Sequence, residues 1–70
     1  MPIVVRLLGV NVRRQRKLKG MTQEQLAAVA EMERSYVSDL ERGTRNRSVA
    51  ELGRIADALG IEPHVLLLKS

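Results

Sequence analysis

Apolar residues recur along this chain every three or four positions, which is the spacing of one face of an α-helix. The first helix is expected over about residues 7–19, with Leu8 and Val12 facing inward. Gly20 supplies a stop signal, because glycine readily adopts the left-handed conformation that ends many helices. The same helical spacing continues through the rest of the chain and predicts no strand, so the expected fold class is all-α.

Two short helices joined by a tight turn are expected next, near residues 23–30 and 34–42. Thr22 is a favoured N-cap for the first of them, and Gln25 completes a capping box that satisfies exposed amide donors. The residues at inward spacing in this helix are Leu26, Ala27 and Ala30. The two alanines let a crossing helix approach closely, so the segment predicts a helix-turn-helix over about residues 23–42.

The second of these helices divides into an apolar side and a polar side. Val37 and Leu40 form the inward pair. The outer side carries Arg34, Ser35, Ser38, Asp39 and Arg42. Arginine and serine near the beginning of a helix can hydrogen-bond base edges in the DNA major groove. The outer side is therefore a candidate surface for reading DNA.

Two further helices are expected in the last third of the chain. Ser48 and Glu51 form a second capping box. The apolar face that follows has the spacing i, i+3, i+4, i+7 and consists of Leu52, Ile55, Ala56 and Leu59. Gly60 ends this helix, and Pro63 suits the start of a short fifth helix because its missing amide hydrogen has no helical partner there. Short loops between the five helices predict one compact bundle, a single domain over residues 1–70.

The composition limits how this bundle is held together. The chain has no Cys, Phe or Trp and one Tyr, so its core must be aliphatic. Without Cys it has neither a disulfide nor a Cys-ligated zinc site, which indicates a reducing compartment such as the cytoplasm. The apolar start is interrupted by Arg6 and is too short to span a bilayer, so no membrane association is expected. Whether residues 1–6 are helical, extended or part of a subunit contact is open.

Positive charge is concentrated at two places. Twelve Lys and Arg stand against eight Asp and Glu, and residues 13–19 hold five of the basic residues and no acid. At the end of the polar helix and after it come Arg42, Arg45 and Arg47. Basic blocks on both sides of a polar helix fit a polyanion; the alternative is two solvated faces. With the single histidine His64 and scattered acids, the chain offers no nucleophile–base pair or metal-ligand cluster, so we expect no enzyme, metal or cofactor.

These segments together resemble the Cro/repressor-type helix-turn-helix family, the lambda-repressor-like DNA-binding domains. The resemblance covers about residues 8–67: LGVNVRRQRKLKGMTQEQLA for the first two helices, RSYVSDLERG for the recognition helix and SVAELGRIADALGIEPHVLL for the last two. Within the family, the ERSY and ERGTRN sequences and the short length are most similar to the controller proteins of restriction–modification systems. The resemblance implies a lambda-repressor-like bundle in a prokaryotic or phage transcription regulator that binds specific double-stranded DNA.

The resemblance also implies roles for individual residues. The residues expected to read base edges are Glu33, Arg34, Ser35, Ser38 and Asp39. Arg34 is the best candidate for a bidentate contact with guanine. The residues expected to bind phosphates are Thr22, Gln23, Tyr36, Arg42, Thr44, Arg45, Asn46 and Arg47. For Tyr36 two interpretations are open: its hydroxyl bonds a phosphate, or the ring packs over the turn with its oxygen in solvent.

Arg16 and Glu41 match a pair that forms a partly buried salt bridge between the first and third helices of the family; the alternative is two independent surface charges.

Three positions depart from the family pattern. Glu31 stands where the turn usually has glycine, so it requires either a costly positive φ or a different turn geometry. Glu33 replaces the usual Ser or Thr cap, and its carboxylate interacts favourably with the positive end of the helix dipole. Near DNA it either weakens nonspecific binding by repelling phosphates or accepts a hydrogen bond from the amino group of cytosine. Gln15 replaces an apolar residue.

A single recognition helix reads too few base pairs for a specific site, so we expect a homodimer on two half-sites roughly 34 Å apart. The residues expected at the dimer interface are Ile61, Val65, Leu66, Leu67 and Leu68; the alternative is that they cover the monomer core. The family's regulators block or recruit RNA polymerase, and controller proteins do so at their own promoter, which adds the polymerase as an expected partner. The alternative function is a helix-turn-helix antitoxin or protein-interaction adaptor.

Overall fold

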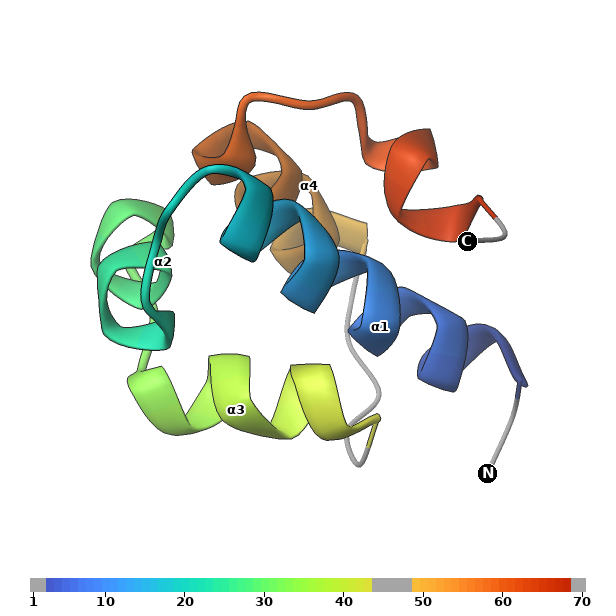
Figure 1. Ribbon diagram of the computed structural model, residues 1–70, viewed down its shortest axis with the longest axis horizontal. Coiled ribbons are helices and arrows are strands. Elements are labelled where there is room, and N and C mark those ends of the chain that lie inside the picture. Colours follow the sequence, from blue (N-terminus) through green and yellow to red (C-terminus); the bar gives the residue numbers. More distant parts are fainter. Residues whose placement is uncertain (1–2, 44–48, 69–70) are drawn as a thin grey trace.

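The computed structural model describes residues 3–43 and 49–68, and these residues form four α-helices and one 3₁₀ helix (Figure 1). The elements are α1 (Ile3–Leu18), α2 (Gln23–Ala30), α3 (Arg34–Arg42), α4 (Val49–Leu59) and the 3₁₀ helix η1 (Pro63–Leu67). These two stretches contain no strand, which confirms the all-α prediction for them. Within them, no helix has the length and apolar character needed to cross a lipid bilayer.

The two ends of the fold differ from the sequence prediction. The first helix begins at Ile3 rather than near Leu7, so residues 3–6 continue α1 instead of leading into it. The fifth element begins at Pro63 as predicted, but it is a 3₁₀ helix and not an α-helix. Its backbone bonds join residues three apart, as from the Val65 amide to the Glu62 carbonyl at 3.0 Å, and tight helices of this kind rarely exceed one turn.

The ends of α2 follow the local signals in the sequence. The Gln25 amide donates to Thr22 Oγ1 at 3.0 Å, and the Thr22 amide donates to Gln25 Oε1 at 2.8 Å, which completes the predicted capping box. At the other end, Glu31 adopts the left-handed conformation with φ 58° and ψ 51°. The positive φ that a glycine usually supplies in this turn is therefore present, at an expected cost of about 1–2 kcal/mol for a residue with a Cβ.

The core lies between all five elements and is almost entirely aliphatic. Its members are Leu8, Val12, Leu26, Ala27, Ala30, Tyr36, Val37, Leu40, Ile55, Ala56, Leu59 and Leu66. In Figure 1, α1 crosses the middle of the molecule, with α3 on one side and α4 and η1 on the other. Because α3 also packs against α2, its inner side is fully used and its outer side is presented away from the core.

Asn11 is a buried polar residue of α1 that the sequence pattern did not single out. Its side-chain Nδ2 donates to the Leu66 carbonyl at 2.8 Å and to the Leu68 carbonyl at 2.6 Å. Both carbonyls belong to the end of η1, where the short helix leaves backbone acceptors without partners of its own. Asn11 therefore attaches the C-terminal segment to the first helix.

Replacing Asn11 with alanine is expected to lower the free energy of unfolding by about 1–3 kcal/mol, because two carbonyls lose their donor at a buried site. Urea unfolding followed by circular dichroism measures this change. Arg14→Ala is the matched control: the side chain is exposed on the same helix, so its loss should change stability by less than about 0.5 kcal/mol. Equal stabilities for the two variants would contradict the attachment.

Candidate nucleic-acid interface

The outer side of α3 brings together the residues that the sequence assigned to base reading. Arg34, Ser35 and Arg42 are exposed, and Ser38 and Asp39 are half-buried. Tyr36, Val37 and Leu40 face the core from the opposite side of the helix. The helix therefore separates a polar, accessible surface from an apolar one along its whole length. The major groove of B-DNA admits an α-helix, so the polar surface of α3 is suited to it.

Asp39 and Arg42 are one unit rather than two independent sites. Arg42 Nη2 bonds Asp39 Oδ1 one helical turn away, with 64% of the Arg42 side chain and 29% of the Asp39 side chain exposed. An exposed pair of this kind adds less than about 1 kcal/mol to stability. It does offset the negative charge of Asp39 on a surface that would otherwise repel phosphates.

Glu33 occupies the N-cap position of α3 in an extended conformation, with φ −70° and ψ 143°. Its side chain makes no capping hydrogen bond, and it is exposed. The carboxylate is thus adjacent to the first turn of α3, next to Arg34, where it favours the positive end of the helix dipole.

The predicted pair of Arg16 and Glu41 forms a bidentate ion pair between α1 and α3. Arg16 Nε donates to Glu41 Oε2 at 2.6 Å, and Arg16 Nη2 donates to Glu41 Oε1 at 3.1 Å. Arg16 Nη1 also donates to the Met21 carbonyl at 2.8 Å. The exposed fractions of the two side chains are 11% and 4%, so the alternative of two independent surface charges is wrong.

Gln23 joins the same carboxylate from the first position of α2. Its Nε2 donates to Glu41 Oε1 at 3.1 Å, so one carboxylate links α1, α2 and α3. An amide nitrogen has two hydrogens, and the second remains a donor for a phosphate. Thr22, just before it, is exposed and accepts the Gln25 amide, which leaves its hydroxyl hydrogen to donate. Both predicted phosphate ligands therefore keep a donor while their positions are fixed.

Tyr36 differs from both interpretations of the sequence. The residue is buried, and its hydroxyl donates to Glu51 Oε1 on α4 at 2.8 Å. The hydroxyl is therefore directed to the neighbouring helix and not presented on the outer side of α3 or left in solvent. The sequence could not indicate this contact, because the pattern of α3 alone does not reveal which helix lies behind it. The assignment of Tyr36 to phosphate binding is corrected accordingly.

The dimer residues predicted from the sequence separate into three groups by burial. Leu66 is 0% exposed and belongs to the monomer core, so its assignment to the dimer interface was wrong. Leu67 and Leu68 are 45% and 54% exposed. Ile61 and Val65 are half-buried between these extremes. Of the three consecutive leucines, Leu66 of the 3₁₀ helix thus lies in the core, and Leu67 and Leu68 are exposed.

Some predicted positions lie outside the described residues. These are the phosphate-binding candidates Thr44, Arg45, Asn46 and Arg47, together with Ser48 of the second capping box. In the part of the chain that the structure describes, no group of three or more His, Cys, Asp or Glu is arranged to hold a metal ion.

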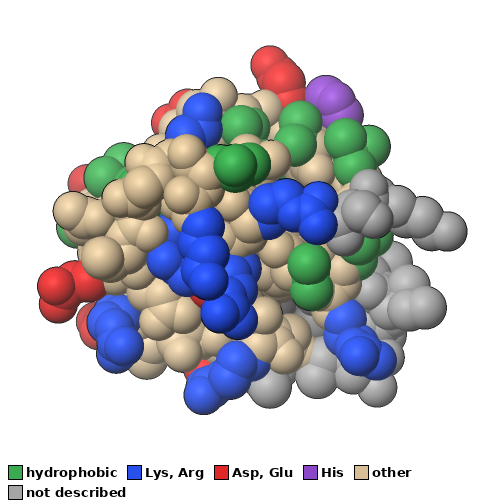
Figure 2. Space-filling model, in the orientation of Figure 1, with side chains coloured by type: hydrophobic (Ala, Val, Ile, Leu, Met, Phe, Trp, Pro, Cys, Tyr) green, Lys and Arg blue, Asp and Glu red, His purple; other side chains and the backbone are tan. Residues whose placement is uncertain are grey.

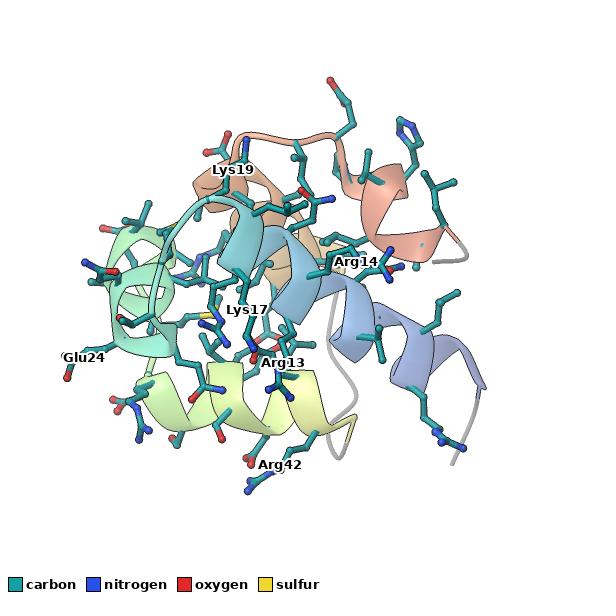
Figure 3. The ribbon with its side chains drawn as sticks, viewed as in Figure 1. Arg13, Arg14, Lys17, Lys19, Glu24 and Arg42 are labelled. Atoms are coloured by element: carbon teal, nitrogen blue, oxygen red, sulfur yellow. The ribbon has the colours of Figure 1, made fainter. Side chains whose placement is uncertain are left out.

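The structure places part of the basic block of residues 13–19 on one face of α1, which the sequence alone had not resolved. Arg6, Arg13 and Lys17 are exposed and share one face of α1, at the spacing i, i+7, i+11. In Figure 3 the side chains of Arg13 and Lys17 extend from α1 over the space beside α3, and Arg42 lies at the end of α3. The salt bridges found among the described residues do not include Arg6, Arg13 or Lys17. Figure 2 shows blue side chains spread over this face of α1 and α3, with acidic ones mostly at its margins.

Comparison with known proteins matches this arrangement to a well-populated family. A family model described as helix-turn-helix matches residues 12–66. Control protein C.BamHI from Bacillus amyloliquefaciens is 48% identical over 62 residues, which cover 87% of this chain and 76% of the relative. The restriction-modification controller protein C.AhdI from Aeromonas hydrophila is similar in structure, with a TM-score of 0.86 and 42% identity over 89% of this chain and 94% of that one. The controller protein C.Esp1396I, solved as a tetramer in complex with its natural 35 base-pair operator, gives a TM-score of 0.88 at 30% identity, over 94% of this chain and 87% of that one.

Proposed function

This chain belongs to the helix-turn-helix family of DNA-binding transcription regulators, and we propose that it binds a specific operator in double-stranded DNA with α3 in the major groove. The observation that carries the proposal is the polar outer side of α3, held at a fixed angle by the buried Arg16–Glu41 pair and bordered by the basic face of α1. A rigid helix with exposed donors, beside a cationic surface, supplies both base contacts and phosphate contacts.

Base reading falls to the first two turns of α3. Arg34 has five donors in a planar fork and is proposed to bond a guanine through O6 and N7. Ser35 and Ser38 are proposed to contact neighbouring base edges. Asp39 and Glu33 are acceptors, and each is suited to the exocyclic amino group of cytosine. The bond to Arg42 orients Asp39 for this contact.

Phosphate binding is proposed on both sides of α3. Thr22 and Gln23 at the start of α2 supply donors on one side, and Arg42 supplies one at the end of α3. The loop residues assigned from the sequence remain part of the proposal: Thr44, Arg45, Asn46 and Arg47. To them we add Arg13 and Lys17 of α1, the helix that packs against α3, as further phosphate contacts.

A homodimer is proposed because one recognition helix reads too few base pairs for a specific site. The exposed Leu67 and Leu68 lie in the segment that Asn11 attaches to α1, and they are proposed to form the interface together with the half-buried Ile61 and Val65. By analogy with the control-protein relatives, we propose that the dimer acts in the cytoplasm on its own promoter and that of a linked restriction–modification gene, blocking or recruiting RNA polymerase. No catalytic step is proposed.

Fluorescence anisotropy with two labelled duplexes tests the proposal: one from upstream of the protein's own gene, and one with the same composition in scrambled order. A preference of about 1,000-fold or more for the upstream duplex is expected, with an affinity that falls steeply as salt rises. Equal and weak binding to both duplexes would instead favour an antitoxin or adaptor that docks a protein.

Two single-charge variants separate base reading from phosphate binding. Arg34→Ala is expected to cost about 1–3 kcal/mol on the upstream duplex and to relax the preference at one base position. Arg13→Ala should instead weaken binding to both duplexes alike and reduce the salt slope by about one unit. Titrations at three salt concentrations measure both quantities. If Arg13→Ala changed the preference and Arg34→Ala did not, the two assignments would be reversed.

A further inference from the structure

Arg54 of α4 bonds the backbone at the turn between α2 and α3. Its Nε and Nη2 donate to the Ala30 carbonyl at 3.2 Å and 2.9 Å, and Nη2 also bonds the Glu31 carbonyl. Ala30 is the last residue of α2, and Glu31 is its C-cap. One guanidinium group therefore holds the two carbonyls at which the chain leaves α2.

These carbonyls need an external partner. The last carbonyls of an α-helix have no partner within the helix, and they carry the negative end of its dipole. The helix α2 has eight residues, which is too short to be stable without contacts from the rest of the fold. A cation with several donors at this position satisfies the carbonyl groups and the dipole together.

The same turn contains the strained residue of the described chain. Glu31 is the one non-glycine residue with positive φ in the described part, and this conformation is unfavourable for a residue with a Cβ. Only Met32 and Glu33 separate it from Arg34, where α3 begins. A change in the backbone at Glu31 therefore changes the direction in which α3 leaves the turn.

We propose that Arg54 is a positioning residue for DNA recognition: from α4 it holds the turn at Glu31 and thereby fixes the orientation of α3. The guanidinium group compensates for the absence of glycine at this position, because it stabilises a conformation that the Glu31 side chain disfavours. The inference rests on the proposed DNA-binding function, and it adds to it a residue that contacts neither a base nor a phosphate.

Removing Arg54 should weaken binding to the specific duplex more than binding to other DNA. Hydrogen bonds to base edges read the sequence and depend on where α3 places its donors, whereas phosphates are present on every duplex and carry no sequence information. Without Arg54, the strained turn gains alternative conformations and α3 is presented at a range of angles. Binding to the specific duplex should then weaken while binding to scrambled DNA is maintained.

The test compares four variants of the full chain: Arg54→Met, Arg54→Lys, Glu31→Gly and the double variant Arg54→Met with Glu31→Gly. Methionine keeps an aliphatic stem without donors, and lysine keeps the charge without the planar fork. Arg14→Met on the exposed face of α1 removes the same charge as a matched control. Anisotropy titrations with the upstream and scrambled duplexes give the specificity ratio and the salt slope.

Arg54→Met is expected to lower the specificity ratio roughly tenfold with an unchanged salt slope and an affinity for scrambled DNA within about twofold of wild type. Arg54→Lys should recover part of the ratio. Adding Glu31→Gly should restore most of it, because glycine adopts the left-handed conformation without help. Arg14→Met should leave the ratio unchanged. If Arg54→Met alone does not fold, recovery of a folded, specific protein on adding Glu31→Gly supports the same coupling.

Four results would overturn the inference, and the last of them would overturn the proposed function as well. Equal weakening on both duplexes with a shallower salt slope would make Arg54 a direct phosphate contact. An unchanged ratio in Arg54→Met, with wild type clearly specific, would remove Arg54 from DNA recognition and leave the proposed function intact. Equal effects of Arg54→Met with and without Glu31→Gly would show that the turn is not what the residue supports. A wild-type ratio near one would overturn the proposed function itself, and the inference with it.

Discussion

Replacing Glu41 with alanine is expected to lower the free energy of unfolding by about 3–5 kcal/mol, because the buried guanidinium group of Arg16 then loses its counter-charge. Arg16 and Glu41 are 11% and 4% exposed at their side chains, so solvent cannot replace the missing carboxylate. Gln23 loses its acceptor in the same change. The core of a domain of about this size rarely supplies more than about 3–5 kcal/mol, so the variant should be partly unfolded near room temperature.

Urea unfolding of three proteins checks this expectation. Asp39→Ala is the matched control, because it also removes a carboxylate that bonds an arginine on α3. Its arginine partner is 64% exposed, so that ion pair is worth less than about 1 kcal/mol. The double variant Arg16→Met with Glu41→Leu removes both charges, and it should be close to wild type in stability, since apolar replacement of a buried pair is often neutral. If Glu41→Ala were no more costly than Asp39→Ala, the pair would not be a buried element of the fold.

The double variant also separates stability from DNA recognition. The Glu41 carboxylate on α3 accepts hydrogen bonds from Arg16 of α1 and Gln23 of α2, so we expect it to fix the angle at which α3 is presented. A stable protein with apolar residues at both positions should therefore keep its affinity for scrambled DNA and lose preference for the upstream duplex. Buried ion pairs are expected to contribute more to a specific geometry than to stability, and this comparison tests that role directly.

The features that the sequence predicted correctly have local causes or belong to the family resemblance. The capping box of Thr22 and Gln25 is decided by residues three apart, and the helical spacing of α2 and α3 places their apolar sides inward. The pairing of Arg16 with Glu41 was expected from positions in the family pattern. The same pattern singled out Glu31 but left open whether its φ would be positive or the turn geometry different, and the structure has the positive φ. None of these required knowledge of how the last two elements pack.

The features that the sequence did not reveal are contacts between residues far apart in the chain. Asn11 bonds the end of η1, Tyr36 bonds Glu51 on α4, and Arg54 bonds the end of α2. Each of these side chains is polar, and neither its helical period nor its charge indicates which distant carbonyl or carboxylate it meets. The inward turn of one C-terminal leucine likewise depends on a 3₁₀ helix, whose spacing is too close to that of an α-helix to be recognised over one turn.

Replacing Gly9 with alanine is expected to destabilise the protein by about 3 kcal/mol, the upper part of the range for overpacked cores. A Cβ at Gly9 would lie 2.5 Å from the Leu40 carbonyl oxygen and 2.8 Å from the Glu41 carbonyl oxygen. These are backbone atoms of α3 and cannot rotate away, so α1 and α3 must separate along their crossing. The separation would stretch the Arg16–Glu41 bonds and tilt the helix that is proposed to read DNA.

Gly53→Ala in α4 is the control for this prediction, because a Cβ there meets nothing within 4 Å. Alanine is the better helix former by about 1 kcal/mol, so Gly53→Ala should stabilise the protein while Gly9→Ala destabilises it. Thermal and urea unfolding of the two variants show whether each change raises or lowers the free energy of unfolding. Stabilisation by both changes would show that α1 and α3 have room between them, and the close approach that fixes α3 would then have to be abandoned. Opposite signs, together with a reduced specificity ratio for Gly9→Ala alone, would connect the crossing of these two helices to the recognition of DNA.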